Sequence, residues 1–373
     1  MRVRREIGVN TRAIAARTLL RVTDEGAYSN VLLPHATSAL GGLDRAFVYR
    51  LVTDALRNLR LIDRAIGAAA PRGVDAMDAE VLAVLRIGVG ELTTEASAQV
   101  HATVNENVEA IRQLGNPRAT GFVNAVLRKL SRREGPIEEV EPAISFSVPD
   151  WLHTALVAAH GEVDAAQLIG GLRESGPGTP VRVRPGGAVP TASQPVPGIE
   201  GAYAVAGPME ARPGFTFTDA SSTAVGLAVG PRPGERVLDM AAAPGGKTLH
   251  LWDLAGEEAE IVALDRHRRR LRSARKRLAA AGATPRWVCG DGKRTPFADG
   301  VFDAVLVDAP CTGLGTLRRR PEIAMRLTET SPARLAEQQR QILAEAWRVT
   351  RPQGRIVYSV CTVFAEETVD VVA

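Results

Sequence analysis

Residues 216–373 alternate short apolar runs with helical segments, and this alternation limits the possible folds more than any other feature of the sequence. Segments 266–282 and 333–350 have the apolar spacing of helices. Apolar strands separated by helices predict a parallel sheet that is covered on both faces. Ligands of such sheets bind beyond the carboxyl ends of the strands, where this sequence repeatedly has Asp or Cys. The predicted strands are 235–240, 260–265, 285–291, 302–310 and 354–360.

Residues 1–135 have helical rather than alternating apolar spacing. The segment 78–92 is apolar on most of its faces, so we expect it at the centre of a helical domain. A helix at 120–133 would bury an apolar stripe and end in a cationic tail. That tail either complements the negative end of its own helix or contacts phosphate. The stripe consists of Phe122, Val123, Val126, Leu127 and Leu130, and the tail of Arg128, Lys129, Arg132 and Arg133.

Residues 136–215 are predicted to form a small connecting subdomain. Segment 149–172 can form two helices, and segment 179–187 can form a short strand. Segment 188–214 is rich in Pro and Gly, which favours a mobile surface loop. The predicted domains are therefore 1–135, 136–215 and 216–373.

The bulk composition, with 45% hydrophobic and 24% charged residues, is that of a soluble globular protein. Residues 1–135 hold 19 Lys and Arg against 14 Asp and Glu, and this local excess favours a nucleic-acid partner. The sequence has no apolar run long enough for a membrane span, and no apolar run follows its basic start. Three cysteines outside any CxxC motif and six scattered histidines give no metal-ligand spacing. These features predict a reducing, cytoplasmic location without a membrane or a metal partner.

The sequence VLDMAAAPGGKT, residues 237–248, predicts a strand, a tight turn and the start of a helix. Its glycines, Gly245 and Gly246, let the backbone approach a ligand closely, and the helix N-terminus offers free N–H donors. A Walker A loop would need glycine in place of Ala241, and a dinucleotide fingerprint would need GxGxxG, so the sequence excludes both motifs. A βα turn without a ligand is the alternative interpretation.

Two acids follow this turn at strand ends. Asp265 ends the second strand, where a carboxylate can accept hydrogen bonds from ribose hydroxyls. Asp291 ends the third strand, where it can meet an adenine. Each acid alone is better explained as a solvated strand-end residue or a helix cap. Together with the glycine turn they favour a nucleoside ligand without a polyphosphate clamp, a description that S-adenosylmethionine fits.

Six sequence blocks resemble two known families. GAYSNVLL, HATVNENVEA and TGFVNAVLRKL resemble the all-helical RNA-binding fold of the NusB family. DMAAAPGGKT, DAPCTGLGTLRRRPE and YSVCTVFAEE resemble the signature blocks of the RNA cytosine-5 methyltransferases of the NOL1/NOP2/Sun class. Their combination is similar to the Sun/Fmu/RsmB type, which methylates 16S ribosomal RNA. The resemblance implies an all-α NusB-like domain and an α/β Rossmann-like, S-adenosylmethionine-dependent methyltransferase domain.

The resemblance also implies which residues hold the cofactor. Asp308 has a second implied role, because it would hydrogen-bond the cytosine edge and help to protonate a ring nitrogen during attack. The implied cofactor-binding residues are Ala241, Ala242, Ala243, Pro244, Gly245, Gly246, Lys247, Asp265, Asp291 and Asp308.

The chemistry of cytosine explains why two cysteines are needed. Carbon 5 is a poor nucleophile, and addition of a thiolate to carbon 6 makes it enamine-like. Neighbouring parallel strands that end at one edge would bring Cys311 and Cys361 into one cleft beside the methyl donor. The resemblance assigns the attack to Cys361 and product release to Cys311, whereas DNA enzymes attack with a Pro-Cys cysteine. The target base must be unstacked, so we expect a single-stranded loop or flipped base of ribosomal RNA as substrate.

Three arginines, Arg318, Arg319 and Arg320, follow Cys311 closely in the sequence. They would raise the local positive potential around that thiol or bind RNA phosphate, and a solvated surface run is the alternative. Cys289 matches no catalytic position and is expected to be a packed structural thiol.

Three features depart from the family's pattern. Val360 stands where threonine is usual, and Thr218 stands where glutamine is typical. The chain ends 12 residues after Cys361, whereas the family continues into a helix and a terminal hairpin, so we expect the hairpin to be missing and the Cys361 strand to lie at the sheet edge. Two other functions stay open: a non-catalytic RNA-binding scaffold, and a methyltransferase that acts on DNA or protein.

Overall fold

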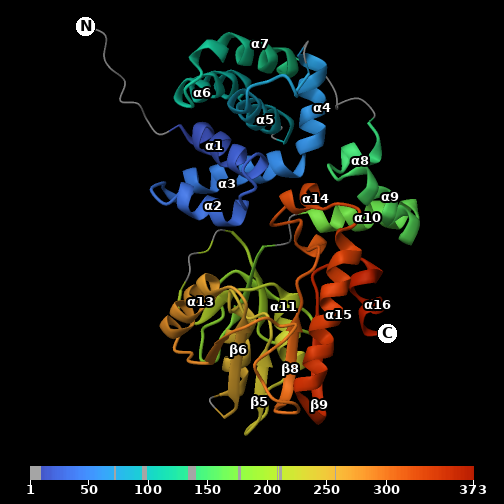
Figure 1. Cartoon of the computed structure of the whole chain (residues 1–373). Helices are drawn as coiled ribbons and strands as arrows, with labels where there is room; N and C mark the ends of the chain where they lie inside the picture. The colour runs from blue at the N-terminus through green and yellow to red at the C-terminus, as the bar shows by residue number, and fades with distance from the viewer. Residues whose placement is uncertain are drawn as a thin grey trace. The chain divides into compact units, whose positions relative to one another are not determined.

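The computed structural model describes residues 10–70, 73–94, 99–132, 140–174, 178–207, 209, 212–256 and 258–373. The chain folds into two compact units, and each unit is built from two separate stretches of sequence. We call Met1–Glu174 with Leu314–Glu329 the helical unit, and Ser175–Gly313 with Thr330–Ala373 the sheet unit. Figure 1 shows the elements of both units. The domain boundaries predicted at residues 135 and 215 stay predictions.

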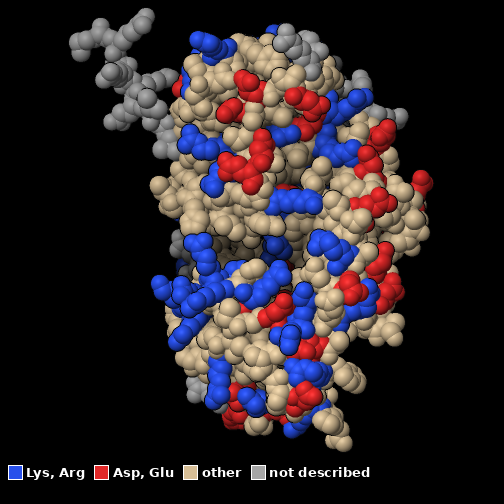
Figure 2. All heavy atoms as spheres, in the orientation of Figure 1, with Lys and Arg blue, Asp and Glu red and all other residues tan. Residues whose placement is uncertain are grey.

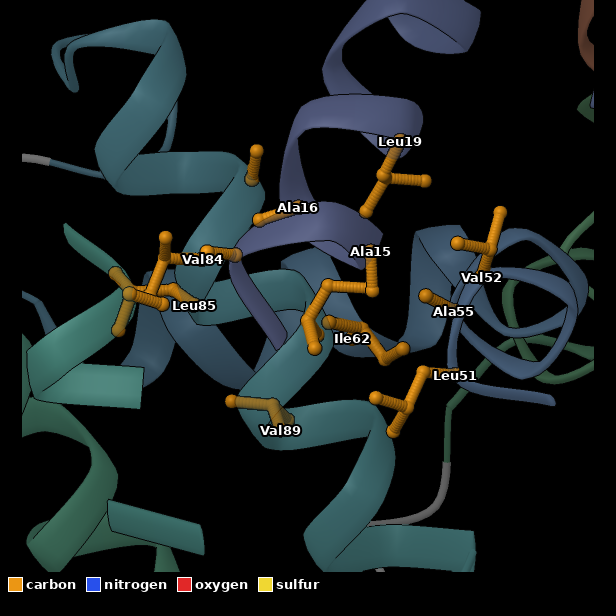
Figure 3. Close-up of a cluster of buried hydrophobic side chains, with 14 of the residues drawn as sticks. Ala15, Ala16, Leu19, Leu51, Val52, Ala55, Ile62, Val84, Leu85 and Val89 are labelled. Atoms are coloured by element: carbon orange, nitrogen blue, oxygen red, sulfur yellow. The ribbon is translucent and has the colours of Figure 1, made fainter. Parts of the chain in front are cut away.

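Helix α5 (Ala79–Thr94) is the central helix of the helical unit. The other helices of the unit's first stretch are α1 (Thr11–Thr23), α2 (Ser29–Ala36), α3 (Gly42–Arg57), α4 (Leu59–Ala69), α6 (Val100–Gln113), η1 (Pro117–Ala119), α7 (Thr120–Ser131), α8 (Pro142–Ser145), α9 (Asp150–His160) and α10 (Glu162–Arg173). Helix α5 packs against α1, α3, α4, α6 and α7, as its apolar faces predicted. Gly88 allows this close packing, because a Cβ there would lie 2.8 Å from the Leu127 side chain. Figure 3 shows Ala, Leu, Ile and Val side chains that fill this core.

Helix α7 buries part of the stripe predicted for segment 120–133. Val123, Val126 and Leu127 are buried, but Phe122 is 38% exposed, so its predicted burial is wrong. Successive residues of a helix point about 100° apart, and this rotation places Phe122 at the margin of the stripe that Val123 begins. Arg133, at the end of the predicted cationic tail, lies outside the described residues.

The segment Leu314–Glu329 belongs to the helical unit although it follows a strand of the sheet unit in sequence. It contains η2 (Leu314–Thr316) and α14 (Glu322–Arg326). The Ser29 backbone N–H and hydroxyl donate to Glu322 Oε1 at 3.0 and 2.9 Å, and Arg57 donates to the Arg318 carbonyl at 2.7 Å. These contacts attach the segment to helices formed by the first residues of the chain. The sequence did not predict this attachment.

The sheet unit contains a small antiparallel sheet of four strands in the order β2-β3-β1-β4. The strands are β1 (Thr179–Val183), β2 (Ser193–Pro195), β3 (Ala202–Val205) and β4 (Phe215–Phe217). Two of them, β2 and β3, lie in segment 188–214, but they cover only 193–195 and 202–205, so loop dominates the described part of this segment, as the sequence predicted. Pro195 ends β2, which is an edge strand, and proline is tolerated there because no ladder hydrogen bond is lost. Residues 208, 210 and 211 of the segment lie outside the described residues.

A parallel sheet of five strands forms the rest of the sheet unit, in the order β7-β6-β5-β8-β9. Its strands are β5 (Arg236–Asp239), β6 (Glu260–Asp265), β7 (Arg286–Cys289), β8 (Phe302–Asp308) and β9 (Thr350–Ser359). Its helices are α11 (Ala220–Val229), α12 (Gly246–Ala255), α13 (Arg268–Ala280), α15 (Ser331–Val349), η3 (Ala365–Glu367) and α16 (Val369–Val372). The predicted parallel sheet is therefore confirmed, and β9 is its edge strand.

Alternate residues of the central strands pack on opposite faces of this sheet. Val305 and Val307 of β8 pack with Ala346 of α15, whereas Ala304 and Leu306 pack against α11 and α12. Burial on both faces explains why these strands are apolar along their whole length. Strand order reverses between β5 and β8, and such a switch point is where open α/β sheets bind ligands. No helix in the described part of the chain has the length and apolarity to cross a membrane.

Candidate active site

The turn between β5 and α12 has the geometry that its sequence predicted. Gly245 has a φ of 96°, a left-handed conformation that favours glycine, and a Cβ there would lie 2.9 Å from Leu278. A Cβ at Gly246 would meet no atom within 4 Å, so the first residue of α12 faces open space. The N–H groups of the first helical turn lack intrahelical partners, and they can therefore donate to a ligand.

Asp265, at the end of β6, holds this turn in place. Its two carboxylate oxygens accept from the backbone N–H groups of Ala243 at 3.0 Å and His267 at 2.7 Å. The guanidinium of Arg270 donates to the Ala243 carbonyl at 2.5 Å, and that of Arg277 donates to the Pro244 carbonyl. Helix α13 and β6 thus fix the backbone of residues 243–245 from two directions. The predicted contact of Asp265 with ribose stays a prediction.

Cys289 is the last residue of β7, and Asp291 follows two residues later. Asp291 is exposed and accepts from the Lys293 backbone N–H at 3.0 Å, which closes a turn. Its predicted contact with adenine stays a prediction. Cys289 is also exposed, so its prediction as a packed structural thiol is wrong. Strand β7 is an edge strand, and its last residue has a neighbouring strand on one side only.

The structure brings Cys311 and Cys361 together at the ends of β8 and β9. Their sulfurs lie 3.3 Å apart, and the Cys361 backbone N–H donates to the Cys311 sulfur at 3.3 Å. Asp308 and Ser359, paired in the strands, are 51 residues apart in sequence, whereas the cysteines are 50 apart. Two residues separate Asp308 from Cys311, whereas one residue separates Ser359 from Cys361. One of the two on the β8 side is Pro310, which has no N–H with which to continue the ladder. This one-residue shift aligns the two cysteines.

The two thiols have different surroundings. Cys311 is partly buried, whereas Cys361 is exposed. The contact with Cys361 and then burial raise the pKa of the Cys311 thiol, and the nearby Glu367 carboxylate adds to this effect. Cys311 is therefore a thiol rather than a thiolate near neutral pH. Val360, just before Cys361, packs against the apolar cluster between the sheet and α15.

Asp308 ends β8 and forms an ion pair with Lys247 at the start of α12, at 2.7 Å between Nζ and Oδ2. Its other oxygen accepts from the Ser359 hydroxyl at 3.3 Å. These contacts link the glycine turn to the two strands that carry the cysteines. The structure thereby connects Lys247 and Asp308, two of the residues that the sequence predicted for the site.

Asp239, the last residue of β5, is a residue of this region that the sequence analysis missed. It is 1% exposed and accepts from the Thr248 hydroxyl at 2.7 Å. Burial raises its pKa to about 6, and the charge of Asp308 adds to the rise. Its position at a strand end was the available signal, because Asp265 and Asp308 have the same position. Asp239 is thus a buried acid beneath the turn.

The basic residues predicted to bind RNA belong to the helical unit. Lys129 donates to the last carbonyl of α4, that of Ala69, at 3.2 Å, and Arg128 donates to Asn124 at 2.9 Å. Arg318 and Arg320 are partly buried and Arg319 is exposed. In the sheet unit, α13 carries six arginines and one lysine without an acid, and Figure 2 shows Lys and Arg side chains gathered at this helix.

Within the described ranges, no group of three or more His, Cys, Asp and Glu side chains is placed to hold a metal ion.

Comparison with known proteins finds two family matches, one in each half of the chain. Residues 226–373 match the 16S rRNA methyltransferase RsmB/F family, and residues 9–132 match the NusB family. The ribosomal RNA small subunit methyltransferase B of Thermus thermophilus is 36% identical over 365 residues, covering 95% of this chain and 84% of that protein. That of Xanthomonas campestris is 33% identical over 386 residues, covering 96% and 86%.

Solved structures share the fold. The crystal structure of PH0851 has a TM-score of 0.83 at 21% identity, covering 99% of this chain and 89% of that chain. NSun6 from Pyrococcus horikoshii, solved with SFG, has a TM-score of 0.52 at 18% identity, covering 60% and 86%. From its sequence match to the bacterial relatives over nearly its full length, the chain belongs to the RsmB/F family of 16S rRNA methyltransferases.

Proposed function

We propose that this protein methylates carbon 5 of a cytosine in 16S ribosomal RNA, with S-adenosylmethionine as methyl donor and a covalent bond between Cys361 and cytosine carbon 6. The observation that carries the proposal is the 3.3 Å separation of the Cys361 and Cys311 sulfurs at the carboxyl edge of the parallel sheet. One nucleophile and one group for elimination, side by side, are what this chemistry requires.

The turn between β5 and α12 supports the choice of cofactor. Three features of this turn fit a nucleoside with a short charged tail. They are the open space at Gly246, the unpaired N–H donors at the α12 N-terminus, and the acids at the strand ends. The residues that would hold it are Ala241 to Lys247 with Asp265, Asp291 and Asp308. When bound, S-adenosylmethionine supplies an electrophilic methyl group. NSun6, a neighbour in fold, was solved with SFG.

Cys361 is the better placed nucleophile because its sulfur is exposed. Its thiolate would form a bond to carbon 6 as the carbon 5–carbon 6 double bond opens. The displaced electrons form a double bond between carbons 4 and 5, and ring nitrogen 3 takes up a proton. Asp308, held by Lys247, would accept a hydrogen bond from the cytosine edge and assist that protonation. After carbon 5 is methylated, a base removes its proton and the bond between sulfur and carbon 6 breaks.

Cys311 is suited to the second half of this sequence. The raised pKa of its thiol keeps it protonated, so it does not compete with Cys361 for carbon 6. Its sulfur lies within reach of the same adduct and would assist elimination of the Cys361 thiolate. A thiol that stays protonated and a thiol that is exposed divide the two proposed tasks between chemically identical side chains.

The RNA would reach the thiols as an unstacked or single-stranded base. Arg128, Lys129, Arg318, Arg319 and Arg320 are proposed to contact its phosphates, because cations of this kind supply sequence-independent affinity.

A methyl-transfer assay tests the proposal. The protein is incubated with labelled S-adenosylmethionine and unmodified 16S rRNA, DNA or protein, and the digested RNA is analysed for 5-methylcytidine by mass spectrometry. We expect label in RNA alone, as 5-methylcytidine. Label in DNA or protein would contradict the substrate, and RNA binding without transfer would favour a non-catalytic scaffold.

A further inference from the structure

The same dipeptide, Cys-Thr, follows each of the two neighbouring strands. Cys311-Thr312 follows β8, and Cys361-Thr362 follows β9. The two sulfurs lie 3.3 Å apart, and the two threonine hydroxyl oxygens lie 2.6 Å apart. The loops are therefore in contact twice, once through the thiols and once through the hydroxyls.

One carboxylate holds both threonines. Glu367 is fully buried, and its Oε1 accepts from the Thr312 backbone N–H at 2.9 Å. Its Oε2 accepts from the Thr312 hydroxyl at 2.5 Å and from the Thr362 hydroxyl at 3.1 Å. Each threonine is the chain neighbour of one cysteine, so the position of this carboxylate is transmitted to both sulfurs.

Glu367 is itself fixed by two other elements. The Gln339 amide of α15 donates to Glu367 Oε1 at 3.0 Å and to the Pro310 carbonyl at 3.0 Å. The Tyr358 hydroxyl of β9 donates to the Glu367 carbonyl at 2.8 Å. Among the described residues, no Lys or Arg pairs with this carboxylate. Its buried charge is stabilised by neutral donors only, so each of them matters.

From these contacts we infer that Glu367 is a positioning residue that sets the spacing between Cys311 and Cys361, and the inference rests on the proposed function of the two thiols. The cysteines lie in loops beyond the ends of their strands, where the ladder no longer holds the backbone. Attack and elimination at one base require both sulfurs within bonding reach, and a displacement of about 1 Å costs on the order of 100-fold in rate.

Glu345 provides a matched control. It accepts from the Thr295 backbone N–H at 2.6 Å and from the Thr295 hydroxyl at 2.7 Å, which repeats the contact of Glu367 with Thr312. Thr295 adjoins no cysteine, and Glu345 pairs with Arg348 at 2.7 Å. Glu345→Gln therefore removes the charge from a buried threonine–carboxylate contact without touching either Cys-Thr loop.

The experiment compares the full chain with Glu367→Gln and Glu345→Gln in two measurements. The first is the rate of alkylation of Cys311 and of Cys361 by iodoacetamide, followed by mass spectrometry on the protein alone. The second is kcat and KM for methylation of 16S rRNA. For Glu367→Gln we expect the ratio of the Cys311 alkylation rate to the Cys361 alkylation rate to rise at least about 5-fold, because loops no longer held by the carboxylate expose the partly buried thiol, and kcat to fall about 100-fold. KM for RNA should change less than about 3-fold.

Glu345→Gln should leave both the alkylation ratio and kcat within about 3-fold of the original values. If the two variants behave alike in both measurements, Glu367 is a structural residue and the inference is wrong. Should the parent protein transfer no methyl group, the proposed function fails, while the alkylation ratio still decides whether Glu367 controls the thiols. Should Glu367→Gln not fold, Thr362→Val removes the weaker hydroxyl contact, and the same two measurements decide.

Discussion

The two Cys-Thr dipeptides are identical in sequence and differ in environment. Cys311 is partly buried and accepts a hydrogen bond from the Cys361 backbone, whereas Cys361 is exposed. Thr312 is 3% exposed and donates twice to Glu367, whereas Thr362 donates once over a longer distance. The comparison teaches that burial and hydrogen-bond donors distinguish the two thiols, since the residue type is the same in both loops, and the tasks proposed for them follow this difference.

The largest expected effect tests the exposed member of the pair. Cys361→Ala removes the proposed nucleophile, so methylation of 16S rRNA should fall by at least about 1,000-fold, and no covalent complex with RNA should form. Labelled methyl transfer and a denaturing gel measure the two quantities. A covalent complex that persists in this variant would assign the attack to Cys311 and reverse the comparison.

The partly buried member should give a different result. Cys311→Ala leaves the attack intact and removes assistance to elimination, so turnover should fall about 100-fold while a covalent protein–RNA complex accumulates. Cys289→Ala is the control, because its thiol is exposed at the end of β7, apart from both dipeptides in the sequence. Normal turnover in Cys311→Ala would show that the second thiol has no part in the reaction.

Burial also alters an acid at a strand end, Asp239, and here the effect of burial can be measured as stability. The pKa of Asp239 is raised from 3.8 to about 6, so its contribution to stability is present below about pH 4 and is lost as the pH rises through 6. The loss is of order 2–3 kcal/mol. Asp239→Asn should therefore lose less unfolding free energy than the original chain between pH 4 and 7. Urea unfolding at both pH values measures this difference, and parallel curves would contradict it.

The smallest effect is expected on the exposed face of α13. Arg272 lies between Arg268 and Lys276, one turn away on each side, and no acid on the helix offsets the repulsion. Arg272→Glu should raise the unfolding free energy by about 0.5–1 kcal/mol, because two repulsive pairs become attractive. Thermal unfolding at low and high salt checks this, since added salt should reduce the gain. A gain that is independent of salt would exclude repulsion as its cause.

Much of this arrangement could be predicted from the sequence, because apolar spacing and the residue types at strand ends can be recognised without knowing the fold. The parallel strands, the glycine turn and the buried stripe Leu271, Ala274 and Leu278 of α13 follow from spacing alone. The meeting of Cys311 and Cys361 follows from a general property of neighbouring parallel strands, which end at the same edge.

Other features depend on contacts that spacing does not encode. Glu367 reaches Thr312 only because η3 folds back toward β8. The local sequence does not predict the direction in which the chain turns after β9. The attachment of Glu322 to Ser29 joins residues 293 positions apart. The prediction for Cys289 followed from the usual burial of cysteine side chains. It is wrong because β7 lies at the edge of the sheet, and strand order cannot be recognised before the fold is known.

The adjacent glycines of the turn differ in their tolerance of mutation. A side chain at residue 245 would meet both an unfavourable backbone angle and Leu278, so a random library selected for the folded protein should return almost only glycine there. Residue 246 is the first residue of α12 and has room around it, and Gly246→Ala should even favour α12, by less than the about 1 kcal/mol of a helix interior. If selection for activity nevertheless rejects alanine at 246, the vacant volume itself is what the cofactor needs. Larger residues at this position would then offer a way to design the enzyme toward a trimmed cofactor.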